Sequence, residues 1–274
     1  MNLFEHLDLS NEWDRRTAAI YLAAQRRHDG RIQLVSKRNS LLIKVLAWLL
    51  IKVTFGRGLD LVDQAFTTIG HCIYIPGDGS ILGLMDPISR CKLISHEVAH
   101  IDDFFLGDPN ARIWTQEECD GLSQFAKFYL AWIRYPLLGL GYLFAPLPFR
   151  YAYVRQRVEH DGFLRNVEID VVNGEGDISL RRRQGYETYF RDASYAWMST
   201  EKRARELVSS MVRIAKQKYR EGKLDHFKGS ADPLADLDGS VLKYVDVDSL
   251  KHSLVAAREA AVGTAQRSRP AALE

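Results

Sequence analysis

The sequence predicts an α+β protein that is mostly helical, with one small sheet. Four stretches carry apolar residues at three- and four-residue steps, the spacing of a helix with one buried face. They cover residues 11–28, 86–105, 151–172 and 199–219. Two short stretches, 31–37 and 66–75, are rich in β-branched and aromatic residues, which favour strands. Because 66–75 comes shortly before the second helical stretch, we expect an edge strand of the sheet to precede that helix.

The first third of the chain contains a helix, a strand, an apolar segment and a second strand region. Residues 11–28 form the helix, which Asp29 and Gly30 end. The apolar segment 41–55 is too short for a membrane crossing and carries two lysines, so we expect a buried or interfacial helix. Residues 66–75 form one strand, or two strands split at Gly70, before the turn-forming cluster at 76–79.

The helix over 86–105 carries the pattern HExxH. Asp86 is a suitable N-cap and Pro87 suits the first helical position. His96 and His100 are four residues apart, so both imidazoles lie on one face and can bind one metal ion. Two neutral imidazoles suit Zn²⁺, and Glu97 beside them can take a proton from a metal-bound water. The sequence therefore predicts a zinc site on this helix.

The second half of the chain begins with another apolar segment, 125–149. Its prolines and glycines argue against one regular spanning helix, so we expect a helix followed by an apolar loop. Two interpretations stay open: core packing against the zinc helix, or peripheral contact with a membrane, which 41–55 would share. Helices over 151–172 and 199–219 follow, with an aromatic-rich stretch between them.

Composition limits the domain organisation, partners and compartment. With 274 residues, 46% of them hydrophobic, we expect a single domain over 1–228 and a C-terminal extension over 229–274. That extension would hold a short helix at 248–262 and a disordered tail. The 37 basic and 35 acidic residues nearly balance, which argues against a nucleic-acid partner. The N-terminus lacks the pattern of a secretory signal, and the three cysteines suit reduced thiols, so we expect a cytoplasmic protein.

A catalytic zinc site needs a third protein ligand, which the motif does not supply. The metzincin pattern would place glycine and histidine where this chain has Asp103 and Leu106, so that class is excluded. A lone strand histidine, His71, is more simply read as a packed or surface residue than as a ligand. The remaining candidates lie on two later segments: Glu117, Glu118 and Asp120 on the first, and Glu159, His160 and Asp161 on the second.

The stretch Glu159-His160-Asp161-Gly162-Phe163 makes the chain resemble the gluzincins, HExxH zinc hydrolases whose third ligand is a glutamate on a separate downstream helix. The chain is also similar to bacterial and phage proteins of this type. The resemblance spans about 67–163 and implies a zincin-like fold, with Glu159 as third ligand and Gly162 allowing close helix packing. One position departs from the family, because Phe163 stands where many gluzincins have an aspartate that orients the first histidine.

These observations predict a zinc-dependent hydrolase, most simply a peptidase acting on a peptide or protein substrate. His96, His100 and Glu159 would bind zinc, and Glu97 would act as general base. A downstream residue would stabilise the oxyanion, for which Tyr189 and Tyr195 are candidates. The alternative is a non-catalytic, membrane-associated protein with a structural zinc site, although such a site would not require Glu97.

Overall fold

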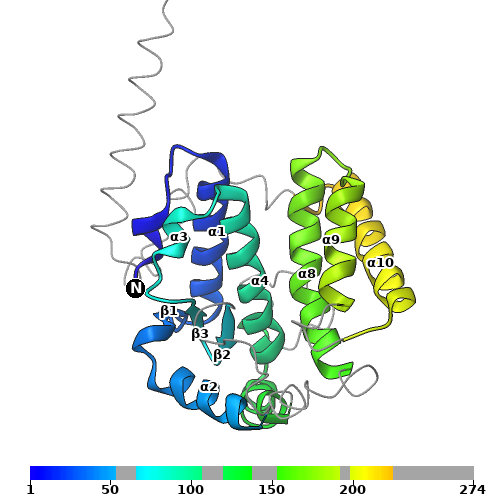
Figure 1. Cartoon of the computed structure of the whole chain (residues 1–274). Helices are drawn as coiled ribbons and strands as arrows, with labels where there is room; N and C mark the ends of the chain where they lie inside the picture. The colour runs from blue at the N-terminus through cyan, green and yellow to red at the C-terminus, as the bar shows by residue number, and fades with distance from the viewer. Residues whose placement is uncertain (54–65, 107–119, 138–152, 192–197, 225–274) are drawn as a thin grey trace, which may run out of the picture.

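The computed structural model describes residues 1–53, 66–106, 120–137, 153–191 and 198–224 (Figure 1). These residues form a mostly helical structure with one three-stranded sheet, which confirms the α+β prediction. The elements in chain order are η1 (Leu3–His6), α1 (Glu12–Arg27), β1 (Gln33–Ser36), η2 (Lys37–Asn39), α2 (Leu41–Val53), β2 (Thr67–Ile69), β3 (Cys72–Ile75), α3 (Ile81–Leu84), α4 (Pro87–Leu106), α6 (Gln124–Tyr129), the π-helix η3 (Leu130–Arg134), α8 (Tyr153–Asn173), α9 (Leu180–Arg191) and α10 (Glu201–Arg220).

The sheet has the strand order β1-β3-β2, so β3 is central and β2 forms one edge. β1 runs parallel to β3, and β2 runs antiparallel to it with Thr68 opposite Ile73. The chain turns between β2 and β3 at Gly70, whose positive φ of 62° is a conformation that glycine adopts without steric strain. Of the two alternatives for the 66–75 stretch, the structure has two strands separated at Gly70, and β2 contacts the HExxH helix α4.

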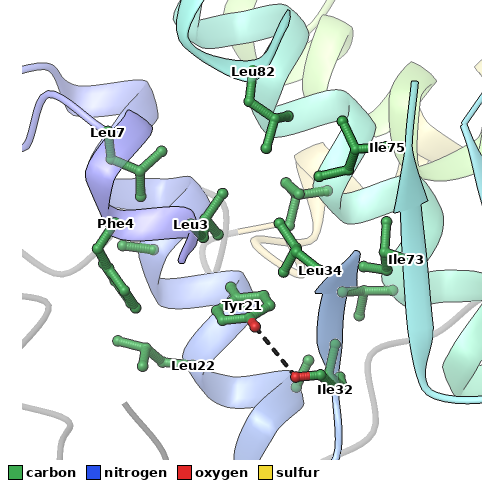
Figure 2. Close-up of a cluster of buried hydrophobic side chains, with 14 of the residues drawn as sticks. Leu3, Phe4, Leu7, Tyr21, Leu22, Ile32, Leu34, Ile73, Ile75 and Leu82 are labelled. Carbon is green, nitrogen blue, oxygen red and sulfur yellow. Dashed lines mark hydrogen bonds between the residues drawn. The ribbon is translucent and has the colours of Figure 1, made fainter. Parts of the chain in front are cut away.

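One hydrophobic cluster joins η1, α1, the sheet, α3 and one side of α4, which together we call the N-terminal unit. Figure 2 shows Leu3 and Phe4 of η1 on one side of this cluster and Ile73 and Ile75 of β3 on the other, with Tyr21 and Leu34 between them. The Tyr21 hydroxyl donates a hydrogen bond to the Ile32 carbonyl oxygen at 3.3 Å, which satisfies the one polar atom of a buried ring (Figure 2).

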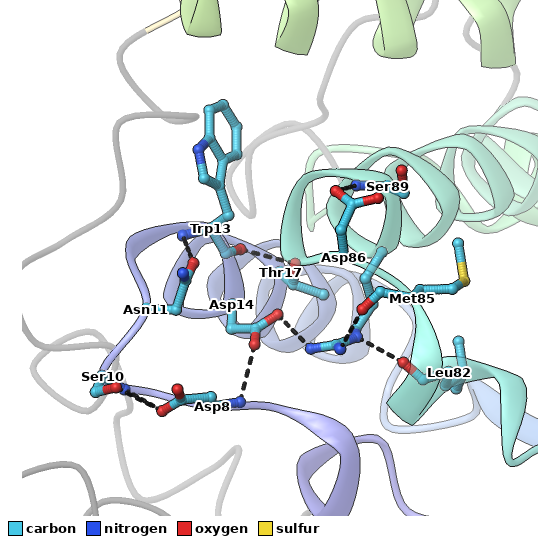
Figure 3. Close-up of polar contacts among 11 residues, drawn as sticks. Asp8, Ser10, Asn11, Trp13, Asp14, Thr17, Leu82, Met85, Asp86 and Ser89 are labelled. Carbon is cyan, nitrogen blue, oxygen red and sulfur yellow. Dashed lines mark hydrogen bonds and ion pairs between the residues drawn. The ribbon is translucent and has the colours of Figure 1, made fainter. Parts of the chain in front are cut away.

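A buried ion pair connects the start of α1 to the start of α4. Arg90 donates to Asp14 at 2.6 Å and to the carbonyl oxygens of Leu82 and Met85, so its guanidinium is bonded on both sides (Figure 3). Asp86 caps α4 as the sequence predicts, because its Oδ1 accepts a hydrogen bond from the Ser89 backbone N–H (Figure 3). These contacts fix the beginning of the helix that carries the motif.

The second hydrophobic cluster joins α8, α9 and α10, which we call the C-terminal unit. Helix α4 packs against α8 along its length, so α4 is covered by the N-terminal unit on one side and by α8 on the other (Figure 1). Helix α9 extends over part of the stretch that the sequence leaves without an element. It buries Tyr186 and Phe190, which are four residues apart, while the rest of its surface is mostly polar.

The described residues include only part of the two apolar segments, 41–55 and 125–149. Helix α2 covers most of 41–55, and α6 with η3 covers the first part of 125–149, as expected; the apolar loop after residue 137 lies outside the described residues. The extension 229–274, including 248–262, also lies outside them. Cys91 is buried and Cys72 is partly buried, and neither forms a disulfide with another described residue; Cys119 lies outside the described residues. Among the described helices, none is long and apolar enough to cross a membrane.

Candidate metal centre

His96 and His100 project from α4 toward α8. Their rings lie one helical turn apart, with centroids 4.6 Å from each other and planes nearly perpendicular. Both side chains are buried, since α8 covers the face of α4 on which they lie. Helical periodicity therefore brings two imidazoles to one buried point, as the spacing predicts.

Glu159 reaches the same point from α8. Its Oε2 lies 3.5 Å from Nε2 of His96, and one ligand atom from each of Glu159, His96 and His100 lies within 4.8 Å of the others. In the part of the chain that the structure describes, this is the group of at least three His, Cys, Asp or Glu side chains that could hold a metal ion. Of the alternatives, Asp120 is exposed, and Glu117 and Glu118 lie outside the described residues.

A glycine makes the approach of α8 possible. A Cβ atom placed on Gly162 would lie 2.6 Å from both Cε1 and Nε2 of His96, far inside van der Waals contact. Any side chain at this position would therefore displace the imidazole or separate the two helices. Gly162 is three residues after Glu159, so one face of α8 supplies both the carboxylate and the space for His96.

Asn166 contacts the other nitrogen of the His96 ring. Its Nδ2 lies 3.3 Å from Nδ1 of His96, while its Oδ1 is buried without a partner among the described residues. Side-chain amide orientation is assigned from the hydrogen-bond network, and turning this amide over would let Oδ1 accept a hydrogen bond from the Nδ1–H of His96. Nε2 would then keep its lone pair toward Glu159 and His100, which is the tautomer that binds a metal.

The contact with Asn166 gives His96 a polar neighbour although Phe163 stands where many gluzincins have an orienting aspartate. Phe163 is buried and packs its ring edge-to-face against His96, with centroids 5.0 Å apart. It therefore confines the imidazole sterically, while Asn166 supplies the polar contact. Asn166 is seven residues, or two helical turns, after Glu159, and this spacing is the signal in the sequence that could have identified it.

Glu97 is buried beside the two histidines and is held by strand β2. The hydroxyl of Thr68 donates to Oε2 of Glu97 at 2.6 Å. The sequence predicts a strand before the motif helix. It does not identify Thr68 as a partner of Glu97, because a contact between residues 29 positions apart depends on tertiary packing. The strand thus orients the carboxylate that the motif predicts as the general base.

Burial and neighbouring charges set the protonation of the three ligands. Burial would raise the pKa of Glu159, but its hydrogen bond to His96 and the fields of both histidines lower that pKa to about 2. Burial and the neighbouring His96 lower the pKa of His100, which favours its neutral form. For His96, burial lowers the pKa, but hydrogen bonding and attraction to Glu159 and Glu97 outweigh it and raise the pKa overall.

The other residues singled out in the sequence lie elsewhere. His71 stacks on Phe105 with ring centroids 3.9 Å apart and does not belong to the metal-binding group. Tyr189 is half exposed and stacks on Phe163, and Tyr195 lies outside the described residues. His160 binds Asp161 at 3.1 Å, beside the cluster rather than in it.

Comparison of the chain with models of protein families, with curated proteins and with solved structures gave no match. A proposal for the function of this chain therefore depends on its own residues. Those residues are the motif on α4, the glutamate on α8 and the contacts that orient them.

Proposed function

We propose that the protein is a zinc-dependent hydrolase, most simply a metallopeptidase of the gluzincin type with a zincin-like fold. The observation that carries the proposal is the convergence of His96, His100 and Glu159 at one buried point, with Glu97 beside it. A structural site would need the three ligands alone. The additional carboxylate, held by Thr68, has a role in hydrolysis and none in a purely structural cross-link.

The donor set fits zinc. Two imidazole nitrogens and one carboxylate oxygen are a known ligand combination for catalytic zinc, and three protein ligands leave a position open. The low pKa of Glu159 and the lowered pKa of His100 favour the deprotonated forms that bind metals, whereas the raised pKa of His96 means that zinc would compete with a proton there. When bound, zinc supplies a Lewis acid that polarises a carbonyl oxygen and makes water more acidic.

The protein groups would then perform the proton transfers. Glu97 takes a proton from the attacking water as the new C–O bond forms at the scissile carbonyl carbon. It delivers that proton to the amine nitrogen as the C–N bond breaks. The Thr68 contact uses Oε2, which leaves Oε1 for proton transfer, and Asn166 keeps His96 in one tautomer.

A peptide substrate is favoured by the position of β2. This strand is an edge of the sheet within the described residues, and Thr68 on it contacts Glu97. An extended peptide could add to such an edge through backbone hydrogen bonds and lie next to the general base. Tyr135 already accepts a hydrogen bond from the Gly70 N–H just after β2, so the substrate would use the strand before that point.

Metal analysis combined with cleavage of a peptide library tests the proposal. The purified protein should contain about one zinc per chain, and Glu97→Gln should keep zinc and fold but lose cleavage, because the carboxylate works on water and does not bind the metal. Glu159→Ala should lose zinc. Asp120→Ala is the matched control, since it removes an exposed carboxylate from the competing segment.

Three outcomes contradict parts of the proposal. Absence of zinc after reconstitution at neutral pH excludes the metal site. Equal cleavage by Glu97→Gln and the parent excludes Glu97 as the base. Zinc binding that needs Glu159, without cleavage of any peptide by the parent, favours the structural alternative.

A further inference from the structure

Helix α2 exposes a row of large apolar side chains. Lys44 is also exposed on this helix, and Ile43 is buried on its inner side. The exposed apolar residues are Leu41, Leu42, Val45 and Trp48. We call this set the α2 face.

The segment α6–η3 exposes a second apolar set. Phe125 and Trp132 have exposed fractions of 76% and 73%, values unusual for such large side chains within helices. The full set is Phe125, Phe128, Tyr129, Trp132, Ile133 and, three residues after η3, Leu137. We call it the α6–η3 face; α2 and α6–η3 both lie at the lower end of the molecule in Figure 1, where α6–η3 is the unlabelled green helix.

The charge pattern of these segments is one-sided. The chain contains 35 acidic residues among 274, yet none occurs between positions 30 and 59 or between 121 and 158. Both faces belong to these acid-free stretches, and each carries an exposed lysine, Lys44 on α2 and Lys127 on α6. Apolar segments whose exposed charged side chains are lysines are complementary to a bilayer with anionic headgroups.

The types of exposed side chain indicate the same partner. Trp48, Tyr129 and Trp132 have large apolar rings with one polar atom each, a combination that suits the boundary between headgroups and acyl chains. Lysine can extend its charged end to that boundary while its methylenes lie on apolar surface. We propose that the α2 face and the α6–η3 face form a membrane-binding surface for anionic phospholipid bilayers.

This surface is tied to the candidate metal centre. Arg134 of η3 binds both the backbone oxygen and the carboxylate of Asp103 on α4, the latter at 3.1 Å. Tyr135 stacks on Phe105 of α4, and its hydroxyl accepts the Gly70 N–H next to β2. Binding of α6–η3 to a bilayer would therefore hold α4 and the end of β2 close to the lipid surface. The inference concerns binding alone and holds whether or not the protein is a hydrolase.

Flotation of the full chain with lipid vesicles tests the inference. We expect binding to vesicles of equal parts phosphatidylcholine and phosphatidylserine, and much weaker binding to phosphatidylcholine alone. Trp132→Glu and Phe125→Glu should each lower the partition coefficient by about tenfold or more, because a charge would enter the apolar boundary. Replacing Lys44 or Lys127 by Gln should lower it by about fivefold each.

The matched controls are Leu84→Glu and Leu180→Glu. These leucines are similarly exposed but lie on α3 and α9, outside both faces, so their variants should bind like the parent. Failure of the parent to bind anionic vesicles overturns the inference, as does equal loss in the control variants. Self-association abolished by Trp132→Glu, without vesicle binding, would assign the faces to a second copy of the chain. If the parent does not bind vesicles and Trp132→Glu lowers the free energy of unfolding, the two faces pack against another part of the same chain instead.

Discussion

The two units that meet across α4 and α8 hold their buried charges in different ways. In the N-terminal unit, both members of each main pair are buried: Arg90 with Asp14, and Arg27 with Asp102 at 2.9 Å. Both pairs connect α1 to α4. The positions of the motif histidines therefore depend on ion pairs that are buried on both sides, and loss of one partner leaves a buried charge without its main compensation.

In the C-terminal unit, buried carboxylates bind cations that reach in from the surface. Asp170 is buried, but Arg182, which binds it, is 43% exposed, and Lys92 of α4 and the Tyr186 hydroxyl also bind it. Glu168 likewise binds the partly exposed Lys218 at 2.6 Å, in addition to the buried Arg165 at 3.3 Å. Asp170 and Glu168 each keep another cationic partner when one is removed, so we expect the N-terminal unit to be the more sensitive to loss of a single ion pair. For the C-terminal unit, the close approach of α8 to α4 is the critical feature.

The largest effect should follow from removing a charge from the N-terminal unit. Arg90→Met leaves the Asp14 carboxylate and two carbonyl oxygens buried without the guanidinium, so we expect a loss of about 3–5 kcal/mol in the free energy of unfolding. The matched change across the interface is Lys92→Met, which leaves Asp170 with Arg182 and Tyr186 and should cost about 1 kcal/mol or less. Urea unfolding of both variants measures the difference. Equal losses would show that the two units do not differ in this respect.

The next effect concerns the approach of the two units. Gly162→Ala would put a Cβ atom against the His96 ring, and we expect it to weaken zinc binding by about 100-fold and destabilise the fold by about 1–3 kcal/mol. Gly185→Ala on α9 is the control, because its Cβ would meet no atom within 4 Å and alanine favours the helix by up to about 1 kcal/mol. Zinc titration and urea unfolding provide the two readouts. A Gly162→Ala protein that binds zinc as tightly as the parent would contradict the geometry described for α8.

A smaller effect should come from the contact that orients His96. Asn166→Ala removes the amide next to Nδ1 and should lower zinc affinity by about 10–100-fold with little change in fold. Asn166→Asp keeps an acceptor at that place and should retain most of the affinity. Competition with a coloured zinc chelator measures all three proteins. If Asp and Ala substitutions weaken binding equally, acceptance of the Nδ1–H is not the function of Asn166.

The strength of local sequence signals decides which helices could be predicted. Helices α1, α4, α8 and α10 were foreseen because their apolar spacing and flanking residues are local signals. Helix α9 was missed, since only Tyr186 and Phe190 are buried and they alone give too weak a period. Outer residues of this helix such as Arg181 are exposed.

The candidate site likewise combines residues that a local pattern predicts with residues that only tertiary packing brings together. The pair His96 and His100 follows from spacing on one helix, and Glu159 was expected from resemblance to a known motif. Thr68 and Asn166 were not identified, because their roles arise from the packing of β2 and α8 against α4. Local periodicity thus predicts which groups share a face, whereas the partner that each group meets depends on tertiary structure.

The smallest expected effect is a pH dependence confined to the N-terminal unit. His71 lies between β2 and β3, and its ring faces His28 at the end of α1 and Phe105 of α4. Burial, with the nearby His28 and Arg31, lowers the pKa of His71 from its ordinary 6.5 to about 4, against a small opposing effect of Asp29. The unfolded chain therefore binds more protons between these values. Stability from this group is complete above pH 6.5 and is lost as the pH falls toward 4.

Because His71 is only half-buried, solvent screening limits its contribution to about 1 kcal/mol or less. His71→Gln removes the titrating group, so the zinc-free variant should lose stability less steeply than the parent between pH 6.5 and 4. His6→Gln, which changes a histidine of η1 outside this cluster, should follow the parent curve. Urea unfolding at a series of pH values measures all three proteins. Parallel curves for His71→Gln and the parent would show that the acid sensitivity of the N-terminal unit comes from other groups, such as Asp102, whose buried pair with Arg27 also weakens when the carboxylate is protonated.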